Sequence, residues 1–389
     1  MVPVPPLHDP QFHAGDPFPA FRRLRAEAPV SWHPTPGFWA LSRHEDVIAV
    51  SRDPATFCSS RGILLSDIER PVTPRQSIIY IDPPEHAKYR RLVQPAFSPG
   101  RIRALEEPIG RMVGQLLDAL EANRAIDFVE AFAAPLPLLV IADMLGVPGA
   151  DRARFKRWSD AIIEAGTQPN EENMAQSAEL LGYFASVLAE RRERPGDDLL
   201  SVLVHSEIDG ERLEEFDLLM FCMTLLVAGN ETTRNLLSHG ALALATYPEQ
   251  RALLGRDPGL MPRAVEEMLR WGSPVSSFMR VATRATEVRG VRIQEGDRLL
   301  LLYASANRDE EVFGPDAEEF QVMRDATHHV AFGFGEHFCL GAQLARMEAR
   351  IAFTQLLARF ARWELAGGVV RLPSLFMRGI VNLPLTLSR

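Results

Sequence analysis

One cysteine stands in a glycine-rich turn near the end of the chain, where residues 331–346 read AFGFGEHFCLGAQLAR. Gly333 and Gly335 precede Cys339 and allow a tight turn that passes close to a flat group. The residues after Gly341 are strong helix formers, so the cysteine lies where a loop enters a helix. Amide N–H groups at such a point favour a thiolate over a thiol. A thiolate in this setting, next to an aromatic ring, is suited to ligate haem iron.

Three other interpretations compete for this turn. A dinucleotide-binding loop needs a third glycine at a fixed spacing, which Gly333 and Gly335 lack. A zinc site needs four ligands, whereas Cys339 and His337 supply two. A structural turn around a buried cysteine is the plain alternative, because a free cysteine is commonly a small buried hydrophobe. Composition alone leaves this last interpretation open beside the haem ligand.

The turn resembles the haem-ligand signature of the cytochrome P-450 superfamily, Phe-Gly-x-Gly-x-His-x-Cys-x-Gly. The matching positions are Phe332, Gly333, Gly335, His337, Cys339 and Gly341. The resemblance implies haem b as the cofactor, with Cys339 as the axial ligand of its iron. It also implies cofactor contacts from Phe332, Gly333, His337, Leu340, Gly341 and Ala345. Among these, His337 would donate to a haem propionate.

A predicted helix carries His86 and Arg90 four positions apart, after the helix-start signal Asp82-Pro83-Pro84. Residues four apart share one helix face, so the pair suits a dianionic partner. Taken alone, such a pair is commonly a solvated face. It matches the family's His-x-x-x-Arg pair, which binds haem propionates. Arg280, on a predicted strand, resembles a further propionate-binding arginine of the family, whereas an isolated strand arginine would face solvent.

A long buried helix is expected over about residues 213–245, because its first half is apolar on nearly every face. Its middle contains Ala228, Gly229, Glu231 and Thr232. A kink or polar cap is one explanation, because threonine can bond back to a carbonyl one turn earlier. The run also resembles the family's oxygen-activation segment. There Thr232 and Glu231 would be catalytic, and Ala228 and Gly229 would contact the cofactor, with the glycine leaving room for it or for O2.

Other matches to the family are structural or line the substrate pocket. Glu267 and Arg270 can pair at i, i+3, which alone is a surface feature of small energetic value. In the family this pair is buried, and Arg324 would complete the network. The pocket would be bordered by a loop between Cys58 and Tyr80, by a strand and by a hydrophobic tip. Its candidate residues are Ile63, Leu64, Leu65, Val275, Phe278, Leu375 and Phe376. A plain surface loop or ordinary core packing is the alternative for them.

Charge and cysteine usage narrow the class of protein. The net charge of −9 over 389 residues argues against nucleic acid as a partner. Three widely spaced cysteines form no disulfide framework, which favours a reducing compartment. The start of the chain has no signal pattern, and the most apolar run, residues 218–228, is shorter than the ~20 residues that span a bilayer. We therefore expect a soluble, cytoplasmic protein of bacterial type without a membrane anchor.

The order of these motifs predicts one mainly helical domain of the cytochrome P-450 fold over residues 1–389, with a smaller β-rich part. The β-rich portions are expected at about residues 29–42, 278–303 and 363–389, and residues 104–205 are expected to be mostly helical. The implied activity is that of a monooxygenase, which inserts one oxygen atom from O2 into an organic substrate. Electrons would come from a ferredoxin or flavodoxin that docks on basic residues of the early helices, Lys88, Arg91, Arg101 and Arg103.

The substrate class rests on a resemblance to the actinobacterial branch that oxidises steroid side chains and branched lipids. That resemblance is carried by residues 133–148, 228–235 and 266–271, and it implies a hydrophobic substrate of steroid, terpenoid or fatty-acid type. Two alternatives remain. One is a haem-thiolate enzyme that uses peroxide or catalyses a rearrangement, which would not need the proton relay of Glu231 and Thr232. The other is a haem-based ligand or gas sensor, for which no output domain is evident.

Overall fold

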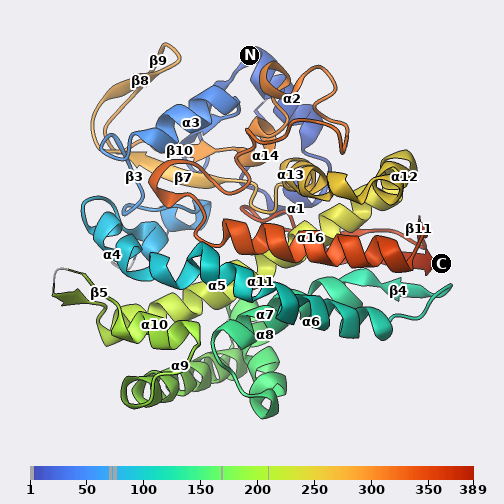
Figure 1. Ribbon diagram of the computed structural model, residues 1–389. Coiled ribbons are helices and arrows are strands. Elements are labelled where there is room, and N and C mark those ends of the chain that lie inside the picture. Colours follow the sequence, from blue (N-terminus) through green and yellow to red (C-terminus); the bar gives the residue numbers. More distant parts are fainter. Residues whose placement is uncertain (1–3, 70–71, 73–76, 168–169, 209) are drawn as a thin grey trace.

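In the computed structural model, residues 4–69, 72, 77–167, 170–208 and 210–389 are described. A five-stranded sheet and the N-terminal helices form one side of the molecule, and helices α4 to α10 form the other (Figure 1). The helix α16 (Ala342–Arg359) crosses between the two sides and packs against α6, α11 and α13. The predicted class, mainly helical with a smaller β-rich part, is confirmed.

The helices pack around one large apolar cluster, whose buried members are spread along the chain between Ile81 and Leu387. The longer ones are α2 (Phe18–Glu27), α3 (His44–Arg52), α4 (Glu85–Val93), α6 (Glu106–Asp118), α7 (Pro135–Met144), α8 (Arg152–Thr167), α9 (Glu171–Glu193), α11 (Glu215–Thr246), α12 (Pro248–Arg256), α13 (Met261–Gly272) and α16. The shorter ones are α1 (Pro10–Ala14), α5 (Pro99–Ala104), α10 (Leu199–His205), α14 (Tyr303–Ala306) and α15 (Glu310–Phe313).

The helix α11 is the axis of the helical part. Its 32 residues span about 48 Å at 1.5 Å per residue. Close packing explains one of its glycines: a Cβ at Gly240 would lie 2.4 Å from the ring of Phe353 on α16 and 2.8 Å from the sulfur of Met268 on α13. Any side chain at this position would push three helices apart. The predicted bounds, 213–245, agree with the observed helix to within two residues.

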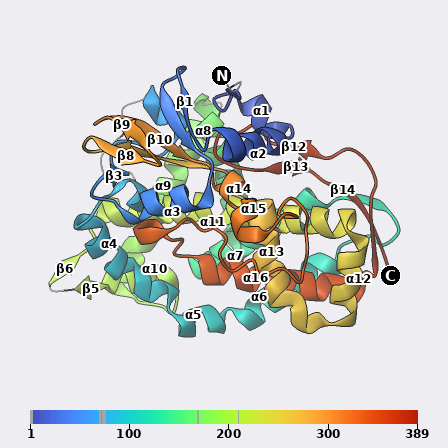
Figure 2. The ribbon, with the colours of Figure 1, turned by 90° about the horizontal axis from the view of Figure 1, so that it is seen from above.

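The main sheet has the strand order β1-β2-β10-β7-β3, and it supports the site from the side of the N-terminal helices. Seen from above, its strands and the β8–β9 hairpin gather on one side of the molecule, opposite α12 and α13 (Figure 2). Its strands are β1 (Val30–His33), β2 (Phe38–Leu41), β3 (Phe57–Cys58), β7 (Phe278–Ala282) and β10 (Arg298–Leu301). The other strands are β4 (Ala125–Asp127), β5 (Glu207–Ile208), β6 (Glu211–Arg212), β8 (Thr286–Val288), β9 (Val291–Ile293), β11 (Arg362–Leu365), β12 (Val370–Arg371), β13 (Ile380–Asn382) and β14 (Pro384–Ser388).

Residues 104–205 are mostly helical, as predicted, and they also contain the strand β4, which forms because β14 offers it an antiparallel edge. The core helix α7 begins at Pro135, after a π-helical turn at Val129–Ala133, rather than near Pro137. The three predicted β-rich portions do contain strands. Among the described residues, no helix combines the length and the apolar character that crossing a bilayer requires.

Candidate functional site

The loop that carries Cys339 is held in one shape by its own backbone. The Cys339 N–H donates to the carbonyl oxygen of Phe332 at 3.0 Å. Gly333 and Gly335 adopt φ angles of +71° and +75°, where other residues are strained. A Cβ at Gly335 would lie 2.2 Å from the carbonyl oxygen of Ser51, so the loop touches α3 at this point. Both predicted glycines are therefore required by the shape of the loop.

The Cys339 side chain is accessible, yet it lies in dense protein. The residue is exposed, but burial by the surrounding chain raises the pKa of its thiol, against smaller opposing effects of the Gly341 amide, Arg90 and Arg346. The sequence predicted that amide N–H groups of the turn would favour the thiolate. The Gly341 amide does lower the pKa of the Cys339 thiol, but in the polypeptide burial has the larger, opposite effect.

An arginine stacked on an aromatic ring fixes this loop to α13. The Arg346 guanidinium lies 4.6 Å from the ring centroid of Phe332 and donates to both oxygens of Glu266, at 2.7 and 2.9 Å. His329 Nε2 lies 3.2 Å from the same carboxylate. Burial alone would raise the pKa of Glu266, but the hydrogen bonds from His329 and Arg346 outweigh it and lower that pKa to about 2. The sequence analysis had not indicated Glu266 in this role.

Four predicted basic residues from three segments come together beside the cysteine loop. The ring centroids of His86, on α4, and His337 lie 4.4 Å apart. Arg90 Nη2 donates to the carbonyl oxygen of Phe338 at 2.6 Å, and Arg280 is buried on β7 rather than facing solvent. Burial lowers the pKa of His86 to about 4, aided by His337, and lowers that of His337 to about 3, aided by Arg280.

One ring nitrogen in this cluster has no hydrogen-bond partner among the described residues. His86 is 2% exposed, and its Nε2 has no hydrogen-bond partner in the part of the chain that the structure describes. A buried polar atom of this kind costs free energy unless something bonds to it. Imidazoles that are kept neutral first by burial and then by neighbouring positive charge are suited to receive an anionic group.

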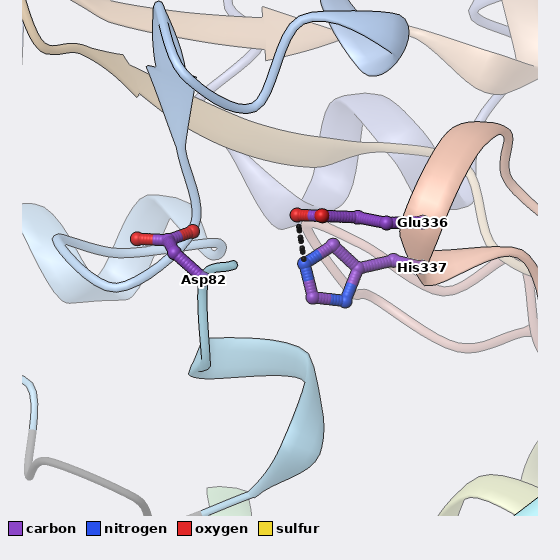
Figure 3. A group of neighbouring side chains, drawn as sticks. All are labelled: Asp82, Glu336 and His337. Carbon is purple, nitrogen blue, oxygen red and sulfur yellow. Dashed lines mark ion pairs between the residues drawn. The ribbon is translucent and has the colours of Figure 1, made fainter. Parts of the chain in front are cut away.

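Two carboxylates lie in this cluster, and the sequence had assigned neither to the site (Figure 3). Ligand atoms of Asp82, Glu336 and His337 lie within 4.8 Å of one another. His337 Nε2 is 3.3 Å from a Glu336 oxygen and 3.1 Å from Ser59 Oγ. The Asp82 carboxylate accepts the N–H of Ser59 at 2.7 Å and that of Ser60 at 3.2 Å. Since Asp82 already bonds the backbone, the trio is better suited to orienting His337 than to holding a metal ion.

The middle of α11 is more accessible than the part of the helix that follows it. Val227 is 38% exposed and Ala228 is exposed, although the same helix is buried throughout residues 235–244. Packing gives a reason for Gly229 that the sequence did not indicate. A Cβ there would lie 2.9 Å from Cδ1 of Ile141 on α7, so glycine lets the two helices pack closely. The contact of Gly229 with the cofactor or O2 stays a prediction.

An acid, a hydroxyl and an arginine follow on α11. Glu231 is 3% exposed and pairs with Arg234, while its Oε1 has no partner among the described residues. Burial raises the pKa of the Glu231 carboxyl, against the opposing charge of Arg234. Thr232 Oγ1 donates to the carbonyl oxygen of Ala228, one turn earlier. A carboxyl that holds its proton unusually well thus stands next to a hydroxyl beside the accessible part of the helix. The sequence had not indicated Arg234.

The predicted pair of Glu267 and Arg270 is fully buried, so the surface alternative is wrong. Arg270 donates to both Glu267 oxygens, at 2.6 and 2.8 Å, and to three backbone carbonyls within residues 307–319. Arg324 Nε reaches Glu267 at 3.3 Å, as the sequence predicted. The network ties α13 to the irregular segment that precedes the cysteine loop.

Three predicted pocket residues, Val275, Phe278 and Phe376, lie where the chain leading into β7 meets the hydrophobic tip that precedes β13. The rings of Phe278 and Phe376 stack with centroids 6.5 Å apart. Val275 pairs with Met377 through an isolated antiparallel bridge. The expected hydrophobic tip therefore does reach the strand that carries Arg280.

The predicted pocket loop joins the same strand from its other side. The Met279 N–H donates to the carbonyl oxygen of Ile63 at 2.6 Å. Leu65 and Met279 belong to one apolar cluster, which Leu375 borders. Ile63 and Leu65 are buried, as ordinary core packing would have them, whereas Leu64 is half-buried. Of the three, Leu64 is the side chain with surface left for a ligand.

Known proteins resemble the chain over nearly its full length. A family model described as Cytochrome P450 matches residues 259–388. The methyl-branched lipid omega-hydroxylase of Mycobacterium tuberculosis is 41% identical over 390 residues, which cover 95% of this chain and 90% of the relative.

Solved structures agree with this result. CYP109E1 of Bacillus megaterium in complex with testosterone superposes with a TM-score of 0.88 at 36% identity, over 96% of this chain and 99% of the other. CYP268A2 of Mycobacterium marinum in complex with pseudoionone gives a TM-score of 0.87 at 37% identity, over 99% of each chain. Both the fold class and the family expected from the motifs are confirmed.

Proposed function

The chain belongs to the cytochrome P450 family of haem monooxygenases, and from this premise we propose that it oxidises a hydrophobic, lipid-like substrate with electrons from a ferredoxin or flavodoxin. Its cofactor is haem b, which the family uses. The observation that carries the proposal is the exposed Cys339, held in a rigid loop beside a cluster of four basic residues, of which His86 and Arg280 are buried.

The residues present fit haem b. Two propionates would bring negative charge to His86, Arg90, Arg280 and His337, and would give the buried His86 Nε2 its missing partner. That charge would raise the imidazole pKa values that burial has lowered. Iron at the Cys339 sulfur would offset the desolvation that now favours the thiol. The remaining contacts that we propose for the cofactor are those of Ala228, Phe332, Gly333, Leu340, Gly341 and Ala345.

Bound haem supplies the iron centre at which O2 is activated, and a thiolate ligand favours cleavage of the O–O bond. The chain supplies the protons. Because its pKa is raised, Glu231 can hold a proton in a buried position and pass it on. Thr232 can turn its hydroxyl from the Ala228 carbonyl toward the accessible space beside that residue. We therefore propose Glu231 and Thr232 as the proton-delivering residues, with Arg234 holding the Glu231 carboxylate in place.

The substrate class is supported from two sides. The relatives act on a methyl-branched lipid or were solved with testosterone or pseudoionone, as their names state. In this chain the segments that meet around β7 present apolar side chains, among them Leu64, Phe278 and Phe376. A steroid, terpenoid or branched fatty acid suits such a surface.

The electron donor is proposed from surface charge. Lys88, Arg91, Arg101 and Arg103 are exposed on α4 and α5, close in sequence to the propionate-binding residues. Lys88 already pairs with Glu211 at 3.0 Å, so the other three are the stronger candidates. An acidic ferredoxin or flavodoxin would associate faster with this surface at low salt.

We also propose that residues 1–389 form one domain that works in the bacterial cytoplasm. The apolar cluster that spans Ile81 to Leu387 supports a single domain. Relatives from Mycobacterium and Bacillus support a bacterial protein, and free cysteines at positions 58, 222 and 339 suit a reducing compartment.

The absorption spectrum of the reduced, CO-bound protein tests the assignment of Cys339. We expect the band that marks a thiolate ligand in the wild type and its loss in Cys339→Ser, while Cys58→Ser, a matched change at a buried cysteine, keeps it. Product formed with NADPH, ferredoxin and its reductase, and not with peroxide alone, would distinguish a monooxygenase from a peroxide-using enzyme. A Cys339→Ser protein with an unchanged spectrum would overturn the proposal.

A further inference from the structure

The segment between β3 and α4 is closed at its base by a carboxylate. Asp82 accepts the N–H groups of Ser59 and Ser60 at 2.7 and 3.2 Å, so the two ends of the segment meet. Ser59 Oγ lies 3.1 Å from His337 Nε2, which joins this base to the proposed propionate site. Ser59, Ser60 and Asp82 therefore lie together beside this site.

A second carboxylate lies inside the segment and collects three donors on one oxygen. Asp67 Oδ2 accepts the N–H of Ile63 and that of Leu64, both at 2.9 Å, and the hydroxyl of Tyr80 at 3.1 Å. Tyr80 is buried and stands at the far end of the segment, next to the base. We call these four residues the Asp67 clamp. Hydrogen bonds to an ionised carboxylate are stronger than those between neutral groups, so the clamp fixes the backbone at Ile63 and Leu64.

The clamp holds the part of the segment that meets the predicted pocket. Beyond Leu64 the chain enters the apolar cluster through Leu65, and the Ile63 carbonyl accepts the Met279 N–H at 2.6 Å. Met279 precedes Arg280 on β7, so the loop is bonded to the strand that carries a cofactor-site residue. Asp67 thus decides where the half-buried Leu64 side chain lies relative to that strand.

We propose that Asp67 is a positioning residue for substrate selection: through Ile63, Leu64 and Tyr80 it fixes one wall of the substrate pocket. The proposal rests on the proposed function, because it takes residues 63–65 to border the substrate. In this proposal Asp67 acts through these three residues and not by direct contact with substrate or haem. Its loss is expected to change which substrates bind, and how tightly, more than it changes the rate of the oxidation step.

Three variants test the clamp. Asp67→Ala removes all three bonds, Asp67→Asn keeps one acceptor oxygen, and Tyr80→Phe removes only the hydroxyl bond. Asp53→Ala is the matched control, because Asp53 Oδ1 accepts the Thr56 N–H at 3.1 Å in the turn just before the segment. Amide hydrogen exchange at Ile63 and Leu64, spectral titration with testosterone and with a methyl-branched fatty acid, and kcat and KM are measured on the holoenzyme.

We expect Asp67→Ala to speed exchange of the two amides and to weaken binding of the better ligand, each at least tenfold, with KM raised and kcat changed less than threefold. Asp67→Asn and Tyr80→Phe should fall between it and the wild type, and Asp53→Ala should match the wild type. Unchanged ligand affinity, or equal effects of Asp53→Ala, would overturn the proposal. Failure of the proposed function and failure of the Asp67 proposal can be told apart. A wild-type protein whose CO spectrum lacks the thiolate band overturns the proposed function, while amide exchange at Ile63 and Leu64 still reports on the Asp67 clamp.

Discussion

The imidazole rings of His86 and His337 lie with their centroids 4.4 Å apart and tilted by 57°, although one residue comes from α4 and the other from the cysteine loop. Neither imidazole is easily protonated, since burial first and neighbouring positive charge second lower the pKa of each. We propose that these two neutral imidazoles, together with Arg90 and Arg280, receive the carboxylates of the haem.

This arrangement predicts that His86→Leu loses haem faster than the wild type. A hydrogen bond to a charged group contributes about 1.5–3 kcal/mol, which corresponds to roughly a 10- to 100-fold faster loss. Transfer of haem to excess apomyoglobin measures the rate. His33→Leu is the control, because His33 is equally buried but bonds to Ser31 on β1. Similar rates for the two variants would exclude a specific role of His86.

Replacement of Thr232 should separate electron consumption from product formation. Without the Thr232 hydroxyl, the proton of Glu231 has no relay to the accessible side of α11. The Thr232→Ala variant should therefore form at least about tenfold less product than the wild type. NADPH oxidation should continue and the missing product should appear as hydrogen peroxide, which is measured alongside product. Thr233→Ala, a change at the next and buried position, serves as control. A product yield per NADPH equal to that of the wild type would rule out the relay.

Loss of Arg270 should damage folding rather than chemistry. Arg270→Ala leaves three backbone carbonyls without this donor. It also removes two hydrogen bonds from the buried Glu267 carboxylate, which keeps those from Arg324 and the Gln321 N–H. Breaking a buried ion pair from one side costs about 3–5 kcal/mol, which denaturant unfolding would measure. Arg263→Ala, at an exposed arginine of the same helix, should cost far less. If both variants unfold at the same denaturant concentration as the wild type, the network is not structural.

Glu348 on α16 predicts an unusual dependence of stability on pH. It is buried, and burial raises the pKa of its carboxyl to about 8. Between pH 4.5 and about 8 the native state therefore binds more protons than the unfolded chain, and the wild type loses stability as pH rises through this window. Glu348→Gln cannot ionise, so its stability relative to the wild type should increase from pH 5 to pH 8.

Unfolding midpoints at several pH values test this expectation. Glu107→Gln is the control, because Glu107 is exposed and its carboxylate reaches only Arg111 on the same helix turn. A difference between Glu348→Gln and the wild type that stays constant across the window would show that Glu348 does not bind a proton on folding.

Local signals in the sequence were enough to identify the cysteine loop and the helices that flank the site. Gly333 and Gly335 had to be glycine because the loop takes positive φ there. The proline pair before α4 marked its start, and the apolar first half of α11 marked a buried helix. These features depend on residues a few positions apart, so the order of residues along the chain determined them.

Only the tertiary structure decided which groups meet and how much water they lose. Arg346 pairs with Glu266, Asp82 lies near Glu336, and Ile141 packs against Gly229, because helices and loops distant in sequence pack together. β4 exists because β14 lies beside it. Desolvation and charge coupling depend on separation in space, and a sequence pattern records separation along the chain. For that reason the sequence indicated the amide that lowers the thiol pKa of Cys339 but not the larger, opposing effect of burial.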